Sequence, residues 1–108
     1  MNPVGKIRMS TTTKMVLDAL LATDRTYGLE ICQQAGLATG TVHPILARLE
    51  GAGWVASEWE DLDPHAAGRP PRRYYRLTPA GAQAATRALA TSPAPHPVRR
   101  TATSMVLP

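Results

Sequence analysis

Phenylalanine is absent from this 108-residue sequence, and the aromatic share is only 5%. Any core must therefore consist mainly of Leu, Val, Ile, Met and Ala, which favours helices. Cysteine occurs once, at Cys32, which excludes a disulfide within the chain and a cysteine-based zinc site. No apolar stretch approaches the roughly 20 residues that span a bilayer, and the first ten residues lack the apolar core of a secretion signal. We expect one domain, in the cytoplasm.

Acidic side chains are missing from the C-terminal part of the sequence. Residues 1–63 carry five basic and eight acidic side chains, whereas residues 69–108 carry seven arginines and no acid. The first part therefore has a charge of −3 and the second a charge of +7. A one-sided arginine block can be a solubilising tail, but it is also typical of a protein that binds a polyanion such as nucleic acid.

Apolar residues at helical spacing predict three helices in the first half of the chain. Hydroxyl groups at Ser10–Thr13 and at Thr26 can cap the first two, and Gly36 can end the second. The third has apolar residues at i, i+3, i+4 and i+7, from Val42 to Leu49. The expected helices cover about Thr12–Ala22, Tyr27–Ala35 and Gly40–Ala52, and the expected inward side chains of the first two are Val16, Leu17, Leu20, Leu21, Leu29, Ile31 and Cys32.

Two strands are predicted next, at about Trp54–Glu60 and Arg73–Leu77, because side chains alternate in character along both. The segment Asp61–Arg72 between them holds three prolines and a glycine, which predicts a mobile hairpin loop. Thr78 and Pro79 then start an alanine-rich helix that runs to about residue 90. We expect the aromatic side chains Trp54, Trp59, Tyr74 and Tyr75 to pack in the core or across strands rather than form a ligand cage.

The two ends of the chain lack such periodicity. We expect residues 1–9 to form a flexible N-terminus and residues 91–108, with four prolines and two arginines, to form a disordered tail. The folded domain then covers residues 10–90. Its order of elements predicts a mainly α fold with a small β-hairpin wing, the winged helix-turn-helix, in which the second helix of the pair enters the major groove.

Two segments carry a family resemblance. YGLEICQQAGLATGTVHPILARLEGAGWV, residues 27–55, and GRPPRRYYRLTPAG, residues 68–81, resemble the PadR family of bacterial transcriptional regulators, whose patterns are close to YGYEI, LSxGTLYPxLxRLExxG and GRPxxYYxLTxxG. The resemblance implies a homodimeric DNA-binding repressor, often one that releases its operator when a small aromatic or drug-like effector binds.

The sequence departs from the family pattern at three places. His43 replaces a usual tyrosine, and Ala38 replaces a serine that commonly caps the recognition helix, which leaves Thr39 as the substitute cap. The family usually continues into a long C-terminal dimerisation helix, whereas Ser92-Pro93 interrupts the helical pattern here. Only four residues could line such a seam: Ala82, Ala85, Ala88 and Leu89.

The face of the third helix opposite its apolar stripe carries only small residues. Such a face can simply be solvated, but in a recognition helix it lets the backbone approach the groove while marginal side chains reach bases or phosphates. The small residues are Gly40, Pro44, Ala47 and Gly51, and the marginal ones are Thr41, His43 and Arg48.

Four arginines fall within eight residues on and beside the second strand, stiffened by Pro70 and Pro71. Exposed arginines are often merely solvated, yet this density fits a wing that follows phosphates or enters a minor groove. Acids across the hairpin, Glu58, Glu60, Asp61 and Asp63, could pair with them and compete with DNA. The predicted DNA-binding residues are Thr39, Gly40, Thr41, His43, Pro44 and Arg48 on the recognition helix, Arg69, Arg72, Arg73 and Arg76 on the wing, and Tyr27 and Gly28 at the start of the second helix.

Catalytic and cofactor motifs are not found in the sequence. It has no phosphate-cradling glycine loop, nucleophile elbow or paired catalytic carboxylates, and His43, His65 and His96 share no metal-ligand spacing. We therefore expect no enzyme, no cofactor and no metal, and Cys32 as a small core residue. Two functions remain open: a sequence-specific DNA-binding regulator, and a winged-helix module that docks onto a protein partner without specific DNA binding.

Overall fold

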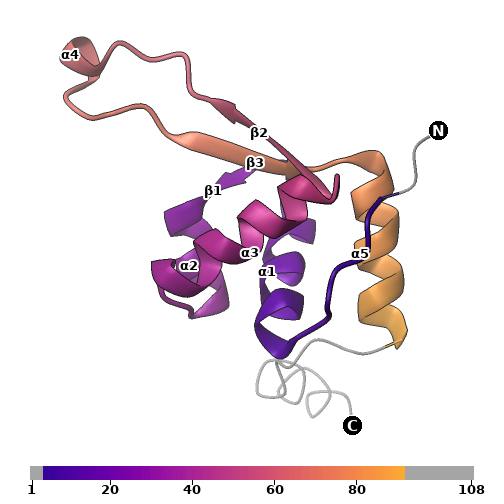
Figure 1. Cartoon of the computed structure of the whole chain (residues 1–108). Coiled ribbons are helices and arrows are strands. Elements are labelled where there is room, and N and C mark those ends of the chain that lie inside the picture. The colour runs from indigo at the N-terminus through magenta and orange to yellow at the C-terminus, as the bar shows by residue number, and fades with distance from the viewer. Residues whose placement is uncertain (1–3, 92–108) are drawn as a thin grey trace, which may run out of the picture.

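The computed structural model describes residues 4–91 of the chain, coloured from indigo to yellow in Figure 1. Five helices and three strands follow one another along these residues. They are α1 (Thr11–Leu21), β1 (Thr26–Tyr27), α2 (Gly28–Ala35), α3 (Thr39–Gly51), β2 (Val55–Trp59), α4 (Pro64–Ala67), β3 (Arg73–Leu77) and α5 (Pro79–Thr91). The expected tail, residues 91–108, lies outside the described residues except for Thr91, which ends α5.

The four main helices begin and end within about one residue of the predicted positions, and two of their caps are as expected. The Thr13 N–H donates to Ser10 Oγ over 3.2 Å at the start of α1, and the Gly81 N–H donates to Thr78 Oγ1 over 2.9 Å at the start of α5. The cap expected at Thr26 is wrong. Thr26 lies in β1, and its hydroxyl donates to Glu30 Oε1 over 2.5 Å instead.

The strands form one antiparallel sheet in the order β1-β3-β2. β2 and β3 make the predicted hairpin, with Ser57 opposite Tyr75, and β1 adds two residues on the other side of β3. β1 was not predicted, because a two-residue strand has no alternation to read. Paired residues share a face of the sheet, so Thr26, Ser57 and Tyr75 face one way while Tyr27 and Tyr74 face the other.

The core is centred on α1, which contacts α2, α3, α5 and β3. Leu17, Ile31 and Leu46 are fully buried there, and Cys32 is buried with them. Two predicted core residues are exposed instead: Leu21, at the last position of α1, and Leu29, on the outer side of α2. Helical spacing predicted that both side chains face inward. Because both helices are short, neighbouring elements cover only part of the apolar face of each helix.

The N-terminal segment packs on the domain, which corrects the prediction that residues 1–9 are flexible, as far as residues 4–9 are described. The Gly5 N–H donates to the Ala52 carbonyl over 2.8 Å, and the Trp54 indole N–H donates to the Gly5 carbonyl over 2.6 Å. A buried indole needs an acceptor, and this segment supplies it. Its three larger apolar side chains, Val4, Ile7 and Met9, lie against the core.

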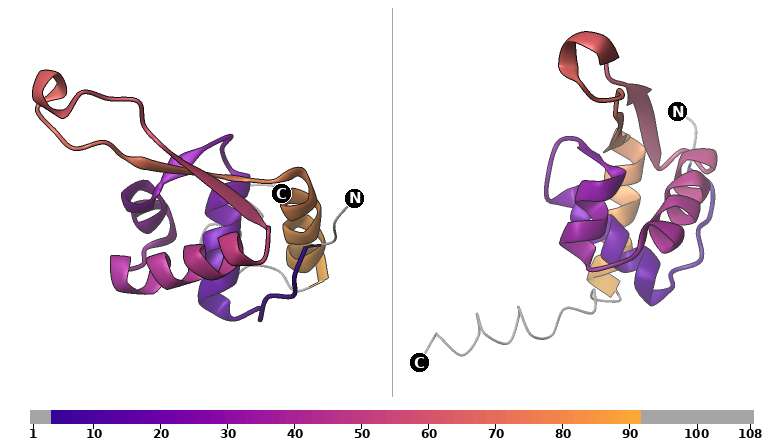
Figure 2. Two further views of the ribbon diagram at one scale, coloured as in Figure 1. Left: turned by 45° about the horizontal axis from the view of Figure 1, so that its top comes forward. Right: turned by 90° about the vertical axis from the view of Figure 1, so that its left-hand side faces the viewer.

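The hairpin between β2 and β3 extends away from the helices, with α4 at its tip (Figures 1 and 2). α4 was not predicted. Asp63 caps it by accepting the His65 N–H over 3.0 Å, and Gly68 ends it in the left-handed region at φ 71°. The expected loop therefore contains one ordered turn of helix.

α5 lies on the other side of the molecule from the hairpin (Figure 1). Ala85 is completely buried in the core of its own domain, and Leu89 packs against that core. Two of the four residues expected to line a dimer seam therefore face their own domain. No helix among the described residues is long and apolar enough to cross a membrane.

Candidate nucleic-acid interface

α2 and α3 form the predicted helix-turn-helix, joined by residues 36–38. Gly36 ends α2 in the left-handed region at φ 69°, a conformation that glycine adopts without strain. Val42, Ile45 and Leu46 anchor α3 to the core. Its opposite side is exposed and consists, as predicted, mainly of small residues: Gly40, Pro44, Ala47 and Gly51, with Thr39, His43 and Arg48 also exposed and Thr41 half-buried.

The N-terminal ends of α2 and α3 have no side-chain cap. Tyr27 is the N-cap of α2 and Ala38 that of α3, and neither accepts a hydrogen bond through its side chain. Thr39 is the first helical residue, so the prediction that it replaces the family serine as cap is wrong. Uncapped first-turn N–H groups and the helix dipole together make these ends attractive to anions.

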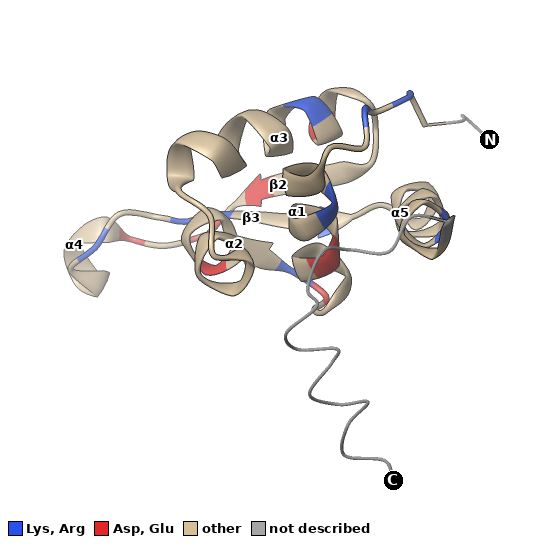
Figure 3. Ribbon diagram, turned by 90° about the horizontal axis from the view of Figure 1, so that it is seen from below, with Lys and Arg blue, Asp and Glu red and all other residues tan. Residues whose placement is uncertain are grey.

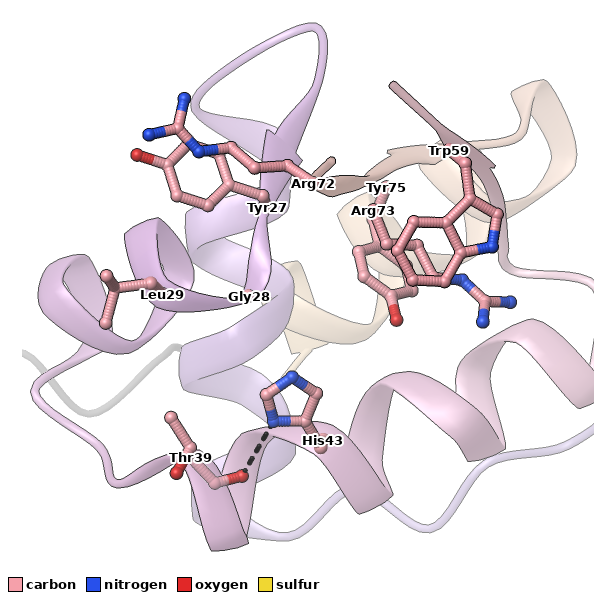
Figure 4. A pocket seen from close by; sticks show the side chains of 9 residues that line it. All are labelled: Tyr27, Gly28, Leu29, Thr39, His43, Trp59, Arg72, Arg73 and Tyr75. Atoms are coloured by element: carbon pink, nitrogen blue, oxygen red, sulfur yellow. Dashed lines mark hydrogen bonds between the residues drawn. The ribbon is translucent and has the colours of Figure 1, made fainter. Parts of the chain in front are cut away.

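A pocket of about 480 Å³ lies between these two helix ends and the base of the hairpin (Figure 4). It brings together six predicted site residues from four elements and the loop before β3. They are Tyr27, Gly28, Thr39, His43, Arg72 and Arg73. The pocket also includes Leu29, Trp59 and Tyr75, which were not predicted as site residues, and its lining contains no acidic side chain.

His43 and Gly28 hold α3 close to the start of α2. The His43 Nδ1 donates to the Thr39 carbonyl over 3.1 Å, so Nδ1 carries a proton and Nε2 points away from that bond. A Cβ atom on Gly28 would lie 2.9 Å from Nε2, which is too close for any larger residue unless the imidazole moves. The glycine of the YG pair is therefore explained by this approach.

Arg72 and Arg25 lie over aromatic rings. The Arg72 guanidinium carbon is 4.5 Å from the Tyr27 ring centre, and that of Arg25 is 3.9 Å from the Tyr74 ring centre. The two tyrosine rings meet edge to face, with centres 5.7 Å apart. Arg25 was not predicted as a site residue, because no charge pattern marks a single arginine in a turn.

Arg73 is held between α3 and β2. Its Nε donates to Ser57 Oγ over 3.0 Å, and its Nη2 donates to Glu50 Oε1 over 3.2 Å. The Ser57 hydroxyl in turn donates to Glu50 Oε2 over 2.6 Å. Acids of the hairpin itself were the expected partners, whereas Glu50 comes from the recognition helix.

Arg69 pairs with Glu60 across the hairpin, as the sequence analysis allowed. Two guanidinium nitrogens donate to the two carboxylate oxygens over 2.8 and 3.0 Å, and the Arg72 N–H donates to Glu60 over 3.2 Å. The hydrogen bond from Arg69 is the main cause that lowers the pKa of Glu60 to about 2, and Glu60 raises the pKa of Arg69. Arg69 is thus neutralised locally and does not line the pocket.

Arg48 and Arg76 are exposed outside the pocket, at the far end of α3 and on β3. Among the described residues, neither has an acidic partner within salt-bridge distance. Basic residues lie along the hairpin, with acidic residues beside some of them (Figure 3). α3 carries a single one, Arg48, in its last turn. No group of three or more potential metal ligands occurs within the part of the chain that the structure describes.

This fold and this arrangement of helices and wing define a winged helix-turn-helix protein. The sequence profile of the transcriptional regulator PadR-like family matches residues 16–87. The chain therefore belongs to the PadR-like family, a family of transcriptional regulators.

Similar solved structures include the PadR family transcriptional regulator of Eggerthella lenta DSM 2243, with 25% identity and a TM-score of 0.61 over 90% of this chain and 82% of that one. The reduced form of AbfR bound to DNA has 25% identity and a TM-score of 0.60 over 78% of this chain and 60% of that one. BpsR of Bordetella bronchiseptica, studied for regulation of its DNA binding by 6-hydroxynicotinic acid, has 18% identity and a TM-score of 0.62 over 92% of this chain and 76% of that one. No curated protein matches the chain significantly.

Proposed function

We propose that the protein is a sequence-specific DNA-binding repressor that places α3 in the major groove and the hairpin on the adjoining backbone or minor groove. The observation that carries this proposal is the pocket, where the start of α3, the uncapped start of α2 and two wing arginines converge. No acidic side chain lines it. Glu50 compensates the charge of Arg73, so Arg72 and the two helix ends are the groups that attract a polyanion.

The two parts of this surface have different roles. Thr41 and His43, near the start of α3, are positioned to read bases, beside a face of small residues that permits close approach. Arg72 contacts phosphate directly, and Arg73 does so by exchanging its Glu50 partner for phosphate, which adds affinity for any duplex. AbfR, a similar fold solved bound to DNA, supports DNA binding by a protein of this fold.

The repressor acts as a homodimer, because one winged helix contacts few base edges and a two-fold dimer doubles them. A small aromatic effector remains a prediction from the family resemblance. BpsR is described as regulated by 6-hydroxynicotinic acid, but at 18% identity that likeness carries the fold alone.

A salt titration tests the proposal. Fluorescence anisotropy would compare the duplex upstream of the protein's own gene with a shuffled duplex of equal length, from about 50 to 200 mM salt. We expect tighter binding to the upstream duplex at every salt concentration and a linear fall of log K with log salt. Equal affinities for the upstream and the shuffled duplex would show that binding is not sequence-specific. Absence of duplex binding, together with a stable complex with another protein, would show a protein-interaction module instead.

A further inference from the structure

Large hydrophobic side chains are exposed at only three of the described positions: Leu21, Leu29 and Trp59. Two of them, Leu29 and Trp59, line the same pocket. Trp59 is 64% exposed and Leu29 is 55% exposed, so neither serves the core. Of the two packing modes predicted for Trp59, the structure shows the cross-strand one, opposite Arg73. Exposed apolar surface gathered at one site marks a binding surface.

Trp59 stands at one side of the pocket beside Arg73, and Leu29 stands on the side of α2 beside the Arg72–Tyr27 stack (Figure 4). The Arg73 guanidinium carbon is 5.7 Å from the Trp59 ring centre. Each side of the pocket therefore pairs an apolar surface with a guanidinium group. The occupant must itself alternate apolar and anionic groups at short spacing.

A DNA strand has this alternation, because each nucleotide places an apolar deoxyribose next to an anionic phosphate, with one phosphate for about every 3.4 Å of helix axis. The pocket volume of about 480 Å³ falls within the roughly 300–1,000 Å³ of sites that enclose ligand-sized groups, so it can take one sugar with its phosphate. A purely apolar partner would leave Arg72 without an anion, since only Arg73 has a carboxylate partner of its own, Glu50, and acidic peptides would leave Trp59 in water.

We propose that this pocket seats the sugar-phosphate backbone of one DNA strand, with Trp59 and Leu29 against deoxyribose and Arg72 and Arg73 toward phosphate. This assignment rests on the proposed DNA binding. It adds Trp59 and Leu29 as apolar backbone contacts that strengthen binding to any duplex without reading its sequence.

Tryptophan fluorescence tests the assignment directly. Trp59 is exposed and Trp54, the other tryptophan, is only 5% exposed, so acrylamide quenching of the free protein reports mainly on Trp59. Acrylamide is uncharged and leaves the ionic strength unchanged. With saturating duplex, we expect the quenching constant of the wild-type protein to fall several-fold. The Trp59→Phe variant should bind DNA and show no comparable change.

Salt dependence separates an apolar contact from an ionic one. Trp59→Ala and Leu29→Ala should each weaken duplex binding by about tenfold, as expected for loss of a largely buried apolar contact, with the slope of log K against log salt unchanged. Leu21→Ala is the matched control, because Leu21 is exposed but lies outside the pocket, and it should bind like the wild type. Thermal unfolding would establish that all three variants are folded.

These experiments distinguish failure of the proposed backbone contact from failure of the proposed DNA binding. If the protein binds duplex but Trp59 stays accessible to acrylamide, the proposed contact with the DNA backbone is wrong although DNA binding stands. The same holds if Trp59→Ala binds duplex as tightly as the wild type. A flatter salt slope in Trp59→Ala would show that Trp59 acts by positioning Arg73, and would also overturn the proposed contact. Absence of any duplex binding overturns both proposals.

Discussion

The arginines around the hairpin differ in what holds them. A guanidinium stacked on a ring keeps its N–H donors free at its edge, as for Arg72 on Tyr27. A guanidinium bound by a carboxylate has donors occupied and its charge compensated, as for Arg69 with Glu60. Arginines that carry the same charge therefore differ in how many N–H donors they can offer to DNA.

Arg72→Ala should remove a phosphate contact, so that the negative slope of log K against log salt becomes shallower by about 0.9. Arg69→Ala should change the slope much less, because Arg69 is already paired with Glu60. Anisotropy titrations of both variants on one duplex measure this difference. Equal losses would mean that DNA displaces Glu60 from Arg69.

Glu60→Gln should leave Arg69 without its compensating charge and so raise affinity for any duplex, most clearly at low salt. The ion pair also stabilises the fold. The pKa of Glu60 is about 2 in the folded protein, against an ordinary 4.5, so this stabilisation is complete above about pH 5. It is lost as the pH falls from there toward 2.

Urea unfolding of wild type and Glu60→Gln at a series of pH values measures this effect. The stability difference between them should be constant from pH 8 to about pH 5 and shrink at lower pH. A difference that grew on acidification would contradict the assignment. Because Glu60 stays ionised throughout the neutral range, the pair with Arg69 is not a pH switch for DNA binding.

Pairing between hairpin acids and arginines could be anticipated from the sequence, but the partners could not. Glu60 was one of four candidates on the hairpin. Glu50, which binds Arg73, lies on α3, and only the packing of the hairpin over that helix brings them together. Contacts across such sequence distance depend on tertiary structure that composition and spacing do not contain.

At the scale of helices and strands, apolar periodicity was sufficient for the long elements. α1, α2, α3, α5 and the hairpin strands lie where apolar spacing and glycine stops put them, but the expected hydroxyl caps form only at α1 and α5. β1, α4 and the N-terminal segment were missed because each is too short to show a period. The packing of that segment depends on distant groups, among them the Ala52 carbonyl and the Trp54 indole.

Gly81 shows how closely α5 approaches Trp54, the residue before β2. A Cβ atom there would lie 1.9 Å from the Trp54 carbonyl oxygen, which explains the glycine that ends the GRPPRRYYRLTPAG segment. Gly81→Ala should force α5 away from the sheet and destabilise the protein by about 1–3 kcal/mol. The control is Gly51→Ala, where nothing lies within 4 Å and helix propensity should stabilise by about 0.5–1 kcal/mol.

Urea unfolding followed by circular dichroism measures both changes. If Gly81→Ala unfolds like the wild type, α5 is packed less closely on Trp54 than the structure shows. If both glycine variants lose stability equally, the effect comes from some general property of helical glycine rather than from this contact.

The approach of α2 to α3 at Gly28 can be isolated by a double-mutant cycle. Gly28→Ala should displace the His43 imidazole and reduce discrimination between the upstream and shuffled duplexes. In a His43→Ala background the same change should have no further effect, because nothing is left to displace. Additive effects in the anisotropy assay would show that Gly28 acts on DNA independently of His43.

At the scale of the whole molecule, the hairpin and α5 lie on opposite sides (Figures 1 and 2). A second copy that pairs through the α5 side would leave each pocket and wing accessible to DNA. The outward side of α5 is lined by Ala82, Gln83, Thr86, Arg87 and Ala90, since Ala85 faces inward. Of the four residues predicted to line a dimer seam, Ala82 lies on this outward side, whereas Ala85 and Leu89 face the core.

A homodimer built in this way should read two half-sites about 34 Å apart, one helical turn of DNA. Sedimentation at micromolar concentration should give twice the 11.6 kDa chain mass. Thr86→Glu would bury a charge in the interface and should shift the protein to monomer while weakening operator binding. Gln34→Glu, an equally exposed change on α2, should remain dimeric. A wild-type protein that stays at 11.6 kDa with and without DNA would exclude the dimer, and a Thr86→Glu protein that remains dimeric would place the interface elsewhere than on α5.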